Sequence, residues 1–318
     1  MVQNDKALAA ISQILAIARV AMNDDNHQQD QPDYILDRNE GVSPTSLACV
    51  LKPLPTRLLV QAAETAKRIN PVNAPVIGPI VSAAAFSVAE PLRIAVLTSK
   101  YWGPKPRRLT VSFMESTPAD LQARIIAHMN AWSQTASISF ATTGGVGDVR
   151  ISREAGGYWS YLGTDILHIP KNRPTMNLEG FTMATAESEY RRVVRHETGH
   201  TMGFPHEHMR KDIVARIDPG KAYKWFSDTY GWDKETVDAQ VLTPLDEASL
   251  MGTPADQTSI MCYQLPGSIT KDGQPIVGGT DIDQTDYAFA AKIYPKLRTD
   301  DLSQPDDWSP VEDVAVAV

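Results

Sequence analysis

The chain has 318 residues, of which 42% are hydrophobic and 21% are charged, and this composition excludes a wholly disordered or collagen-like protein. Its formal net charge of −8 argues against a nucleic-acid partner, because binding to phosphates depends on clustered Lys and Arg. With only two cysteines, Cys49 and Cys262, the chain can form neither a disulfide framework nor a zinc cluster built on cysteines.

The first apolar stretch, Ala7 to Ala21, predicts an amphipathic helix with one apolar stripe. It is shorter than the roughly 18 apolar residues that a membrane span needs, and Ser12, Gln13 and Arg19 interrupt it. We therefore expect no membrane span. A signal peptide is the alternative interpretation, although such a peptide favours a cleaner apolar stretch and a more basic start.

The rest of the N-terminal region is rich in residues that favour turns and loops. Residues 23–37 are polar and predict a loop or linker. Between Gly41 and Pro91, five prolines surround a helical pattern at Leu58 to Ile69. We expect residues 1–91 to form a partly helical accessory region that covers another part of the protein.

After Pro91 the pattern becomes richer in regular structure. Thr117 to Asp120 offer an N-cap and a proline at the start of a helix that runs to about Trp132. A second helix is predicted from Ala186 to about Met202. An order of strand, helix, several strands and helix indicates an α+β fold. The predicted strands are Arg108 to Phe113, Ser137 to Phe140, Asp148 to Ser152 and Thr164 to Ile169.

The second helix carries the clearest chemical pattern in the chain. The segment from His196 to His206 matches H-E-x-x-H-x-x-G-x-x-H at every specified position. His196 and His200 are four residues apart, so a helix places both imidazoles on one face, where they can bind one Zn²⁺. Gly203 can end the helix in a left-handed conformation, and the turn allows His206 to return as a third ligand.

Three histidine ligands leave a fourth coordination position for water, which is typical of a catalytic zinc ion. Zinc lowers the pKa of its bound water from about 15.7 towards 7. Glu197 lies one step round the helix, where it can act as the general base and then the general acid. The pattern thus predicts hydrolysis of peptide bonds with one catalytic Zn²⁺. The alternative is that an HExxH sequence occurs by chance on an ordinary helix. The additional glycine and third histidine of the longer motif argue against this alternative.

This long motif resembles that of the metzincin metallopeptidases. Its continuation, Gly203 to His208 (GFPHEH), is similar to the astacin family of peptidases, whose motif continues as G-F-x-H-E. Ser259 to Tyr263 (SIMCY) resembles the family's Met-turn, S-x-M-x-Y, with Cys262 where the family usually has His. The resemblance implies that Met261 lies beneath the zinc. It also implies that Tyr263 is a switchable zinc ligand and stabilises the transition state.

The resemblance also implies a domain organisation. Residues 92–297 are expected to form an astacin-like domain, whose N-terminal lobe holds a twisted mixed sheet and two helices and whose C-terminal lobe is smaller and irregular. Residues 1–91 would be a pro-segment, and residues 298–318 an acidic tail. Tyr158 to Ile169 would form the edge strand against which an extended substrate pairs its backbone.

Latency is a further expectation. The family's pro-segments often block zinc with the aspartate of F-x-G-D, which we do not find before Pro91. Cys49 is an alternative blocker, because a thiolate binds zinc well. Against this, Leu47 to Leu51 is apolar, and a buried inert cysteine is common. The resemblance further implies cleavage between Ser82 and Lys100, after which the new N-terminus would meet Glu207. The chain would then be a latent precursor, a zymogen.

Several alternatives stay open at this stage. His27, His128 and His168 have no partner at ligand spacing, and His208 is expected to support the site or lie at the surface. The protein could be a catalytically silent metal-binding module, or a hydrolase of a non-protein amide such as a cell-wall cross-link. We expect a protein or peptide substrate and, by default, a monomer. The family resemblance favours secretion, but the N-terminus shows no convincing signal, so cytoplasmic location and non-classical export remain alternatives.

Overall fold

The computed structural model describes residues 49–74, 98–245 and 255–296. The predicted helix at residues 7–21 and the acidic tail lie outside them. Among the described helices, none is both long enough and apolar enough to cross a membrane.

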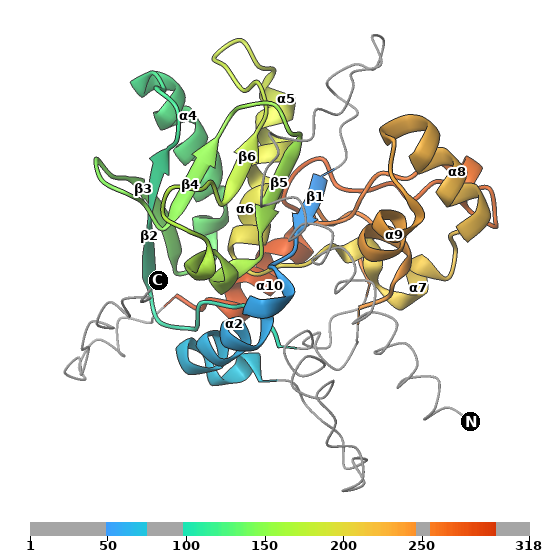
Figure 1. The fold of residues 1–318 in the computed structure, drawn as a ribbon, viewed down its shortest axis with the longest axis horizontal. Helices are drawn as coiled ribbons and strands as arrows, with labels where there is room; N and C mark the ends of the chain where they lie inside the picture. The colour runs from blue at the N-terminus through green and yellow to red at the C-terminus, as the bar shows by residue number, and fades with distance from the viewer. Residues whose placement is uncertain (1–48, 75–97, 246–254, 297–318) are drawn as a thin grey trace, which may run out of the picture.

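One six-stranded sheet organises the larger lobe, with the strand order β1-β5-β6-β4-β2-β3 (Figure 1). Strands β5 and β6 are antiparallel, whereas every other neighbouring pair is parallel. The expected mixed sheet is confirmed. The strands are β1 (Cys49–Lys52), β2 (Arg107–Phe113), β3 (Ile138–Thr142), β4 (Val149–Ser152), β5 (Tyr158–Tyr161) and β6 (Met176–Leu178).

Two helical segments pack against this sheet. Helix α4 (Ala119–Met129) continues as a 3-10 turn, residues 130–134, that buries Trp132. The second segment is α5 (Glu187–Glu189), a π-helical turn at residues 190–194, and α6 (Arg195–Thr201). Both helices were predicted from the sequence. The π-helical turn was not, and it directly precedes the residues of the metal motif.

The smaller lobe consists of short helices and loops. It holds α7 (Lys211–Val214), α8 (Pro219–Tyr230), α9 (Lys234–Val237), and a π-helical turn, η7, at Asp238–Leu242. This lobe has its own apolar cluster, which is separate from the main core. The final helix, α10 (Gln284–Ile293), packs against the 3-10 turn after α4.

The N-terminal region is attached to both lobes. Helix α2 (Thr56–Ile69) contacts the 3-10 helix Gly163–His168. Strand β1 precedes α2 and lies between the sheet and the lobe that carries α7, α8 and α9 (Figure 1). Within the predicted accessory region, the described residues 49–74 thus contact both lobes, while the extent and role of that region stay a prediction.

The strand predicted at Thr164 to Ile169 is wrong, because the chain forms a 3-10 helix at Gly163–His168. Gly163 has a φ of +48°, which favours glycine. A side chain there would collide with the carbonyl oxygen of Lys100, and the Thr164 N–H donates to that same oxygen at 3.0 Å. The alternation of apolar and polar residues is typical of a strand. The conformation is instead determined by the contact with Lys100, which is distant in the sequence.

Arg150 of β4 is 1% exposed, and its guanidinium donates to five backbone carbonyls. We predict that Arg150→Met lowers the free energy of unfolding by about 3 kcal/mol or more, because it leaves buried carbonyl oxygens without donors. Urea denaturation measures this change. The control is Arg108→Met, at an exposed position of β2, which should shift stability by no more than about 0.5 kcal/mol. Equal stability of the two variants would contradict the prediction.

Candidate metal centre

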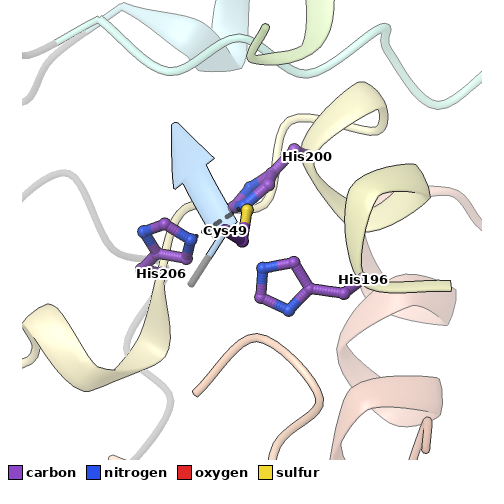
Figure 2. Close-up of side chains that lie close together, drawn as sticks. All are labelled: Cys49, His196, His200 and His206. Atoms are coloured by element: carbon purple, nitrogen blue, oxygen red, sulfur yellow. Dashed lines mark hydrogen bonds between the residues drawn. The ribbon is translucent and has the colours of Figure 1, made fainter. Parts of the chain in front are cut away.

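Helix α6 and the turn after it bring the three predicted histidine ligands together. His196 is 7% exposed, and His200 and His206 are fully buried. The ring centres are 4.7 Å apart for His196 and His200, 4.5 Å for His200 and His206, and 5.4 Å for His196 and His206 (Figure 2). Gly203 has a φ of +97°, so the left-handed turn predicted to return His206 to the site is present.

Hydrogen bonds to backbone carbonyls orient two of these rings. Nδ1 of His196 lies 2.6 Å from the carbonyl oxygen of Ile260, and Nδ1 of His200 lies 2.8 Å from that of Phe204. A carbonyl oxygen can only accept, so each Nδ1 carries the proton and each Nε2 keeps its lone pair. The backbone thus selects the tautomer that a metal ligand requires.

The lone pairs converge on one point. Nε2 of His200 and Nε2 of His206 are 3.0 Å apart, close to the roughly 3.3 Å between two nitrogens that bind one tetrahedral zinc ion at about 2.0–2.1 Å. Nε2 of His196 is buried and has no hydrogen-bond partner among the described residues. Burying a polar atom without a partner is unfavourable. The donor set therefore fits a zinc ion.

Burial also keeps these imidazoles neutral. It lowers the pKa of His196 to about 4 and the pKa values of His200 and His206 well below their usual value. Because a metal binds only the neutral imidazole, the site is ready to accept a cation at neutral pH.

Cys49 joins this group from β1. Its Sγ atom and one nitrogen from each of the three histidines all lie within 4.8 Å of one another, and Figure 2 shows the sulfur beside the three rings. The thiol is buried in an apolar cluster, and burial raises its pKa. An apolar environment and a position at the histidines therefore coexist at Cys49, and its role as a zinc ligand stays a prediction.

Glu197 is fully buried, and neither carboxylate oxygen has a hydrogen-bond partner among the described residues. Burial raises the pKa of this carboxyl to about 8. A carboxyl in such a position is poised to exchange a proton near neutral pH. The sequence prediction that Glu197 is an acid or base is consistent with this environment.

The Met-turn lies directly under α6. The Met261 side chain contacts the Cα of Gly199, where an added methyl group would clash with Sδ and would lie 3.1 Å from Cε. The carbonyl oxygen of Met261 accepts from the Glu207 N–H at 2.8 Å. Thus the turn supports both the helix that carries two ligands and the segment after the third ligand.

Asp286 of α10 fixes the Met-turn, and sequence reasoning missed this residue. Its carboxylate accepts from the Ser259 hydroxyl at 2.6 Å and from the Ile260 N–H at 2.9 Å. It also accepts from Asp283 N–H, which completes a capping box at the start of α10. Asp283 and Asp286 have the spacing of a capping box, but this spacing gives no sign of the contacts with Ser259 and Ile260.

Tyr263 and His208 form a stacked pair beside the metal centre. Their ring centres are 3.9 Å apart with an interplanar angle of 18°. Nδ1 of His208 accepts from the Tyr263 N–H at 3.4 Å, and Nε2 donates to the carbonyl oxygen of Gln240 at 2.8 Å. One neutral tautomer satisfies both bonds. His208 therefore supports the site and does not lie at the surface.

The remaining candidates lie apart from the histidines or outside the described residues. Oε1 of Glu207 accepts from the Asp256 N–H at 3.1 Å, while its expected partner, a new N-terminus, lies outside the described residues. His128 is buried beside Glu187. His27 also lies outside the described residues, and His168 is not part of the cluster of possible metal ligands.

A cavity of about 250 Å³ lies beside Glu197 and Tyr263. Much of its wall is aromatic, and one arginine lines it. A substrate side chain could enter this space next to the metal centre. The residues that give it this character are Tyr158, Arg192, Trp225, Phe226, Tyr230 and Leu265.

Comparisons with known proteins agree with this geometry. The model of the peptidase family Astacin matches residues 96–277, and the chain belongs to this family of zinc metalloendopeptidases. The structure of myroilysin is similar, with a TM-score of 0.59, 28% identity and coverage of 63% of this chain and 97% of that one. The α+β fold is thus shared with a solved protein of the same family.

Two further relatives are more distant. The zinc metalloproteinase nas-27 of Caenorhabditis elegans is 28% identical over 101 residues, which make up 32% of this chain and 22% of that protein. The match therefore spans less than a quarter of this curated relative. High choriolytic enzyme 1, a hatching-enzyme zinc protease of the medaka fish Oryzias latipes, is 18% identical with a TM-score of 0.40, and the match covers 58% of this chain and 87% of that one.

We predict that Gly199→Ala weakens the metal centre, because its methyl group would press on Met261 and lie 3.3 Å from the Trp132 ring. Overpacking of this kind costs about 1–3 kcal/mol, which exceeds the roughly 1 kcal/mol that alanine gains in helix propensity. Zinc affinity and urea denaturation measure the effect.

Gly144→Ala is the matched control, because no atom lies within 4 Å of its added methyl group. The double variant Gly199→Ala, Met261→Ala should be more stable than the sum of the single changes predicts, since the second change removes the clash. Additive effects would contradict the assigned contact.

Proposed function

We propose that the chain hydrolyses internal peptide bonds with one zinc ion held by His196, His200 and His206, and that its N-terminal region keeps it latent. The observation that carries the first part is the convergence of the histidine lone pairs beside the unpartnered carboxylate of Glu197. A zinc ion bound there would lower the pKa of a water towards 7 and polarise the scissile carbonyl.

Glu197 is proposed to move the proton. Both of its oxygens are free of hydrogen bonds to the described residues, so either can accept a proton from the attacking water. The same carboxyl can then donate that proton to the nitrogen of the leaving amine.

Tyr263 is proposed to stabilise the transition state. Its hydroxyl donates to the carbonyl oxygen of Cys49. The O–H can therefore reach a peptide carbonyl in the cleft, which is the space between β5 and η7 that β1 fills. A substrate carbonyl that replaced the one of Cys49 would receive the same bond as negative charge develops on its oxygen. His208 would hold the phenol ring in position through the stacking contact. By resemblance to the family, Tyr263 also serves as the switchable zinc ligand.

Glu197→Gln keeps the shape of the side chain but cannot accept the proton. We predict a fall in kcat/KM of roughly 10²- to 10⁴-fold, with one zinc per chain retained. Cleavage of casein and of a peptidoglycan preparation, alongside zinc content, tests this. The control is Glu154→Gln at an exposed position, which should match the wild type. Retained cleavage by Glu197→Gln would refute its assigned role, and cleavage of peptidoglycan alone would replace the peptidase assignment.

The arrangement of β1 supports the latency proposal. The strand places the Cys49 thiol among the three histidines and its carbonyl oxygen against the Tyr263 hydroxyl. A thiolate is a strong zinc ligand, so Cys49 would fill the position that a water needs for hydrolysis. The N-terminal region would thus block both the coordination position proposed for the water and the proposed oxyanion donor.

We predict that full-length Cys49→Ala cleaves casein at least tenfold faster than the full-length wild type, because the open coordination position becomes available to water. Cleavage in the predicted window from Ser82 to Lys100, most of which lies outside the described residues, should remove the difference. Val50→Ala is the control, since it changes β1 but keeps the thiol. Equal activity of the full-length wild type and Cys49→Ala, with intact N-termini confirmed by mass, would rule out latency through this residue.

A further inference from the structure

The side chain of Gln240 binds the backbone of β1 from the opposite side to the sheet. Its Oε1 accepts from the Leu51 N–H at 3.1 Å, and its Nε2 donates to the Leu51 carbonyl oxygen at 3.1 Å. These two residues are separated by 189 positions in the sequence. Gln240 lies in η7 of the smaller lobe and is 6% exposed.

Strand geometry explains why one residue makes both bonds. In an extended chain the N–H and C=O of a residue point to the same edge, and successive residues alternate between the two edges. Leu51 faces Gln240, so its neighbours Val50 and Lys52 present their backbone groups to β5. In the parallel pairing of these strands Leu51 stands opposite Ser160 of β5, while both of its backbone groups bond to Gln240. The cleft therefore binds an extended peptide along both of its edges.

The carboxamide is held at a fixed position relative to the metal centre. The backbone carbonyl of Gln240 accepts from His208, which stacks on Tyr263. Leu51 follows Cys49 by two residues, so Gln240 binds the peptide at about 7 Å along the strand from the residue at the histidines. The hydrogen bond from His208 and its stacking on Tyr263 thus connect the carboxamide of Gln240 to the metal centre.

The two bonds to Leu51 are the only hydrogen bonds that the Gln240 side chain makes to the residues that the structure describes. The carboxamide does not tie the smaller lobe together. Without β1, its donor and its acceptor would both face the cleft without their present partners. Its chemistry is directed at a peptide backbone.

We propose that Gln240 recognises the peptide backbone in two states: it holds Leu51 while β1 fills the cleft, and it pairs with one residue of an extended protein substrate once β1 has left. This inference rests on the proposed peptidase function and adds a substrate class to it. A carboxamide complements the N–H and C=O of any residue except proline. Rotation of the amide by 180° exchanges donor and acceptor, so a chain of either direction can be bound.

The substrate is therefore an extended segment recognised independently of its sequence at this position, two or three residues from the scissile bond. Proline there would remove the N–H donor. Folded regions, whose backbone groups are already paired, would not bind. Gln240 and β5 together would select unfolded or loop segments of proteins.

Gln240→Met removes both bonds and keeps the length of the side chain. In the full-length chain we expect faster basal cleavage of casein, because β1 is held less tightly. After activation by limited proteolysis we expect the opposite, a KM about 5- to 100-fold higher with kcat nearly unchanged, since two hydrogen bonds to substrate are lost. A merely structural role would lower activity in both states.

A scan of N-methylated peptides identifies the bond directly. One methyl group is placed on successive backbone nitrogens within four residues of the scissile bond. In the wild type, a methyl group at one position two or three residues from that bond should raise KM because it removes the N–H that bonds to Gln240. In Gln240→Met, methylation at this position should no longer raise KM. Methylation at positions whose N–H faces β5 should raise KM in both proteins. An unchanged penalty profile in Gln240→Met would overturn the proposal.

Gln240→Glu provides a second, independent variant. The carboxylate retains an acceptor for the substrate N–H but has no donor for its carbonyl oxygen, so KM should rise while the N-methyl penalty is kept. If Gln240→Met fails to fold, judged by urea denaturation and zinc content, this variant decides, and an unchanged KM overturns the inference. Gln122→Met on α4, whose side chain donates to the Thr117 carbonyl outside the cleft, is the matched control and should behave as the wild type.

The two levels of the proposal fail in different ways. If the activated wild type cleaves no peptide, the peptidase function fails and the inference fails with it. If the wild type cleaves and Glu197→Gln does not, but Gln240→Met leaves both KM and the N-methyl profile unchanged, the inference alone is refuted.

Discussion

The structure depends on three buried imidazoles whose lone pairs meet in a small apolar volume. Backbone carbonyls of Ile260 and Phe204 hold two of the Nδ1 protons, so the lone pairs cannot turn away from one another. Packed against the unpartnered carboxylate of Glu197, such a cluster is unfavourable until a cation is shared among the nitrogens. We therefore expect folding and metal binding to be coupled, and the Met-turn and α10 support this arrangement.

The sequence alone predicted the structure correctly where the contacts that determine it are between residues close in the sequence. The spacing of His196 and His200 and the position of Gly203 are properties of one helix and its end, so the grouping of these histidines with His206 could be predicted. Asp286 and Gln240 bond to residues that are 26 and 189 positions away in the sequence. No local sequence pattern predicts such contacts. The same reason explains why the strand predicted at residues 164–169 is wrong. The alternating sequence pattern predicted a strand, whereas contacts with the distant carbonyl of Lys100 favour a 3-10 helix.

Cys49 illustrates a different limit of sequence reasoning. Its apolar neighbours suggested an inert core residue, whereas the thiol chemistry suggested a zinc ligand, and the two were weighed as alternatives. In the fold the thiol is buried in an apolar cluster and also lies at the three histidines, because β1 covers the residues of the metal motif. A residue's surroundings in sequence describe the strand it belongs to, but they do not reveal which surface that strand covers.

Latency and substrate recognition are proposed to use one surface, and this follows from the needs of a peptide-binding cleft. A strand such as β5 that must pair with substrates has to leave its edge unoccupied, and an open edge pairs with any extended chain. The chain's own N-terminal region is attached nearby, so its effective concentration exceeds that of a free substrate. Strand β1 thus binds the edge of β5 and the carboxamide of Gln240 first. Under this proposal, cutting the connection removes that high effective concentration and lets β1 diffuse away, so proteolysis would be the trigger for activity.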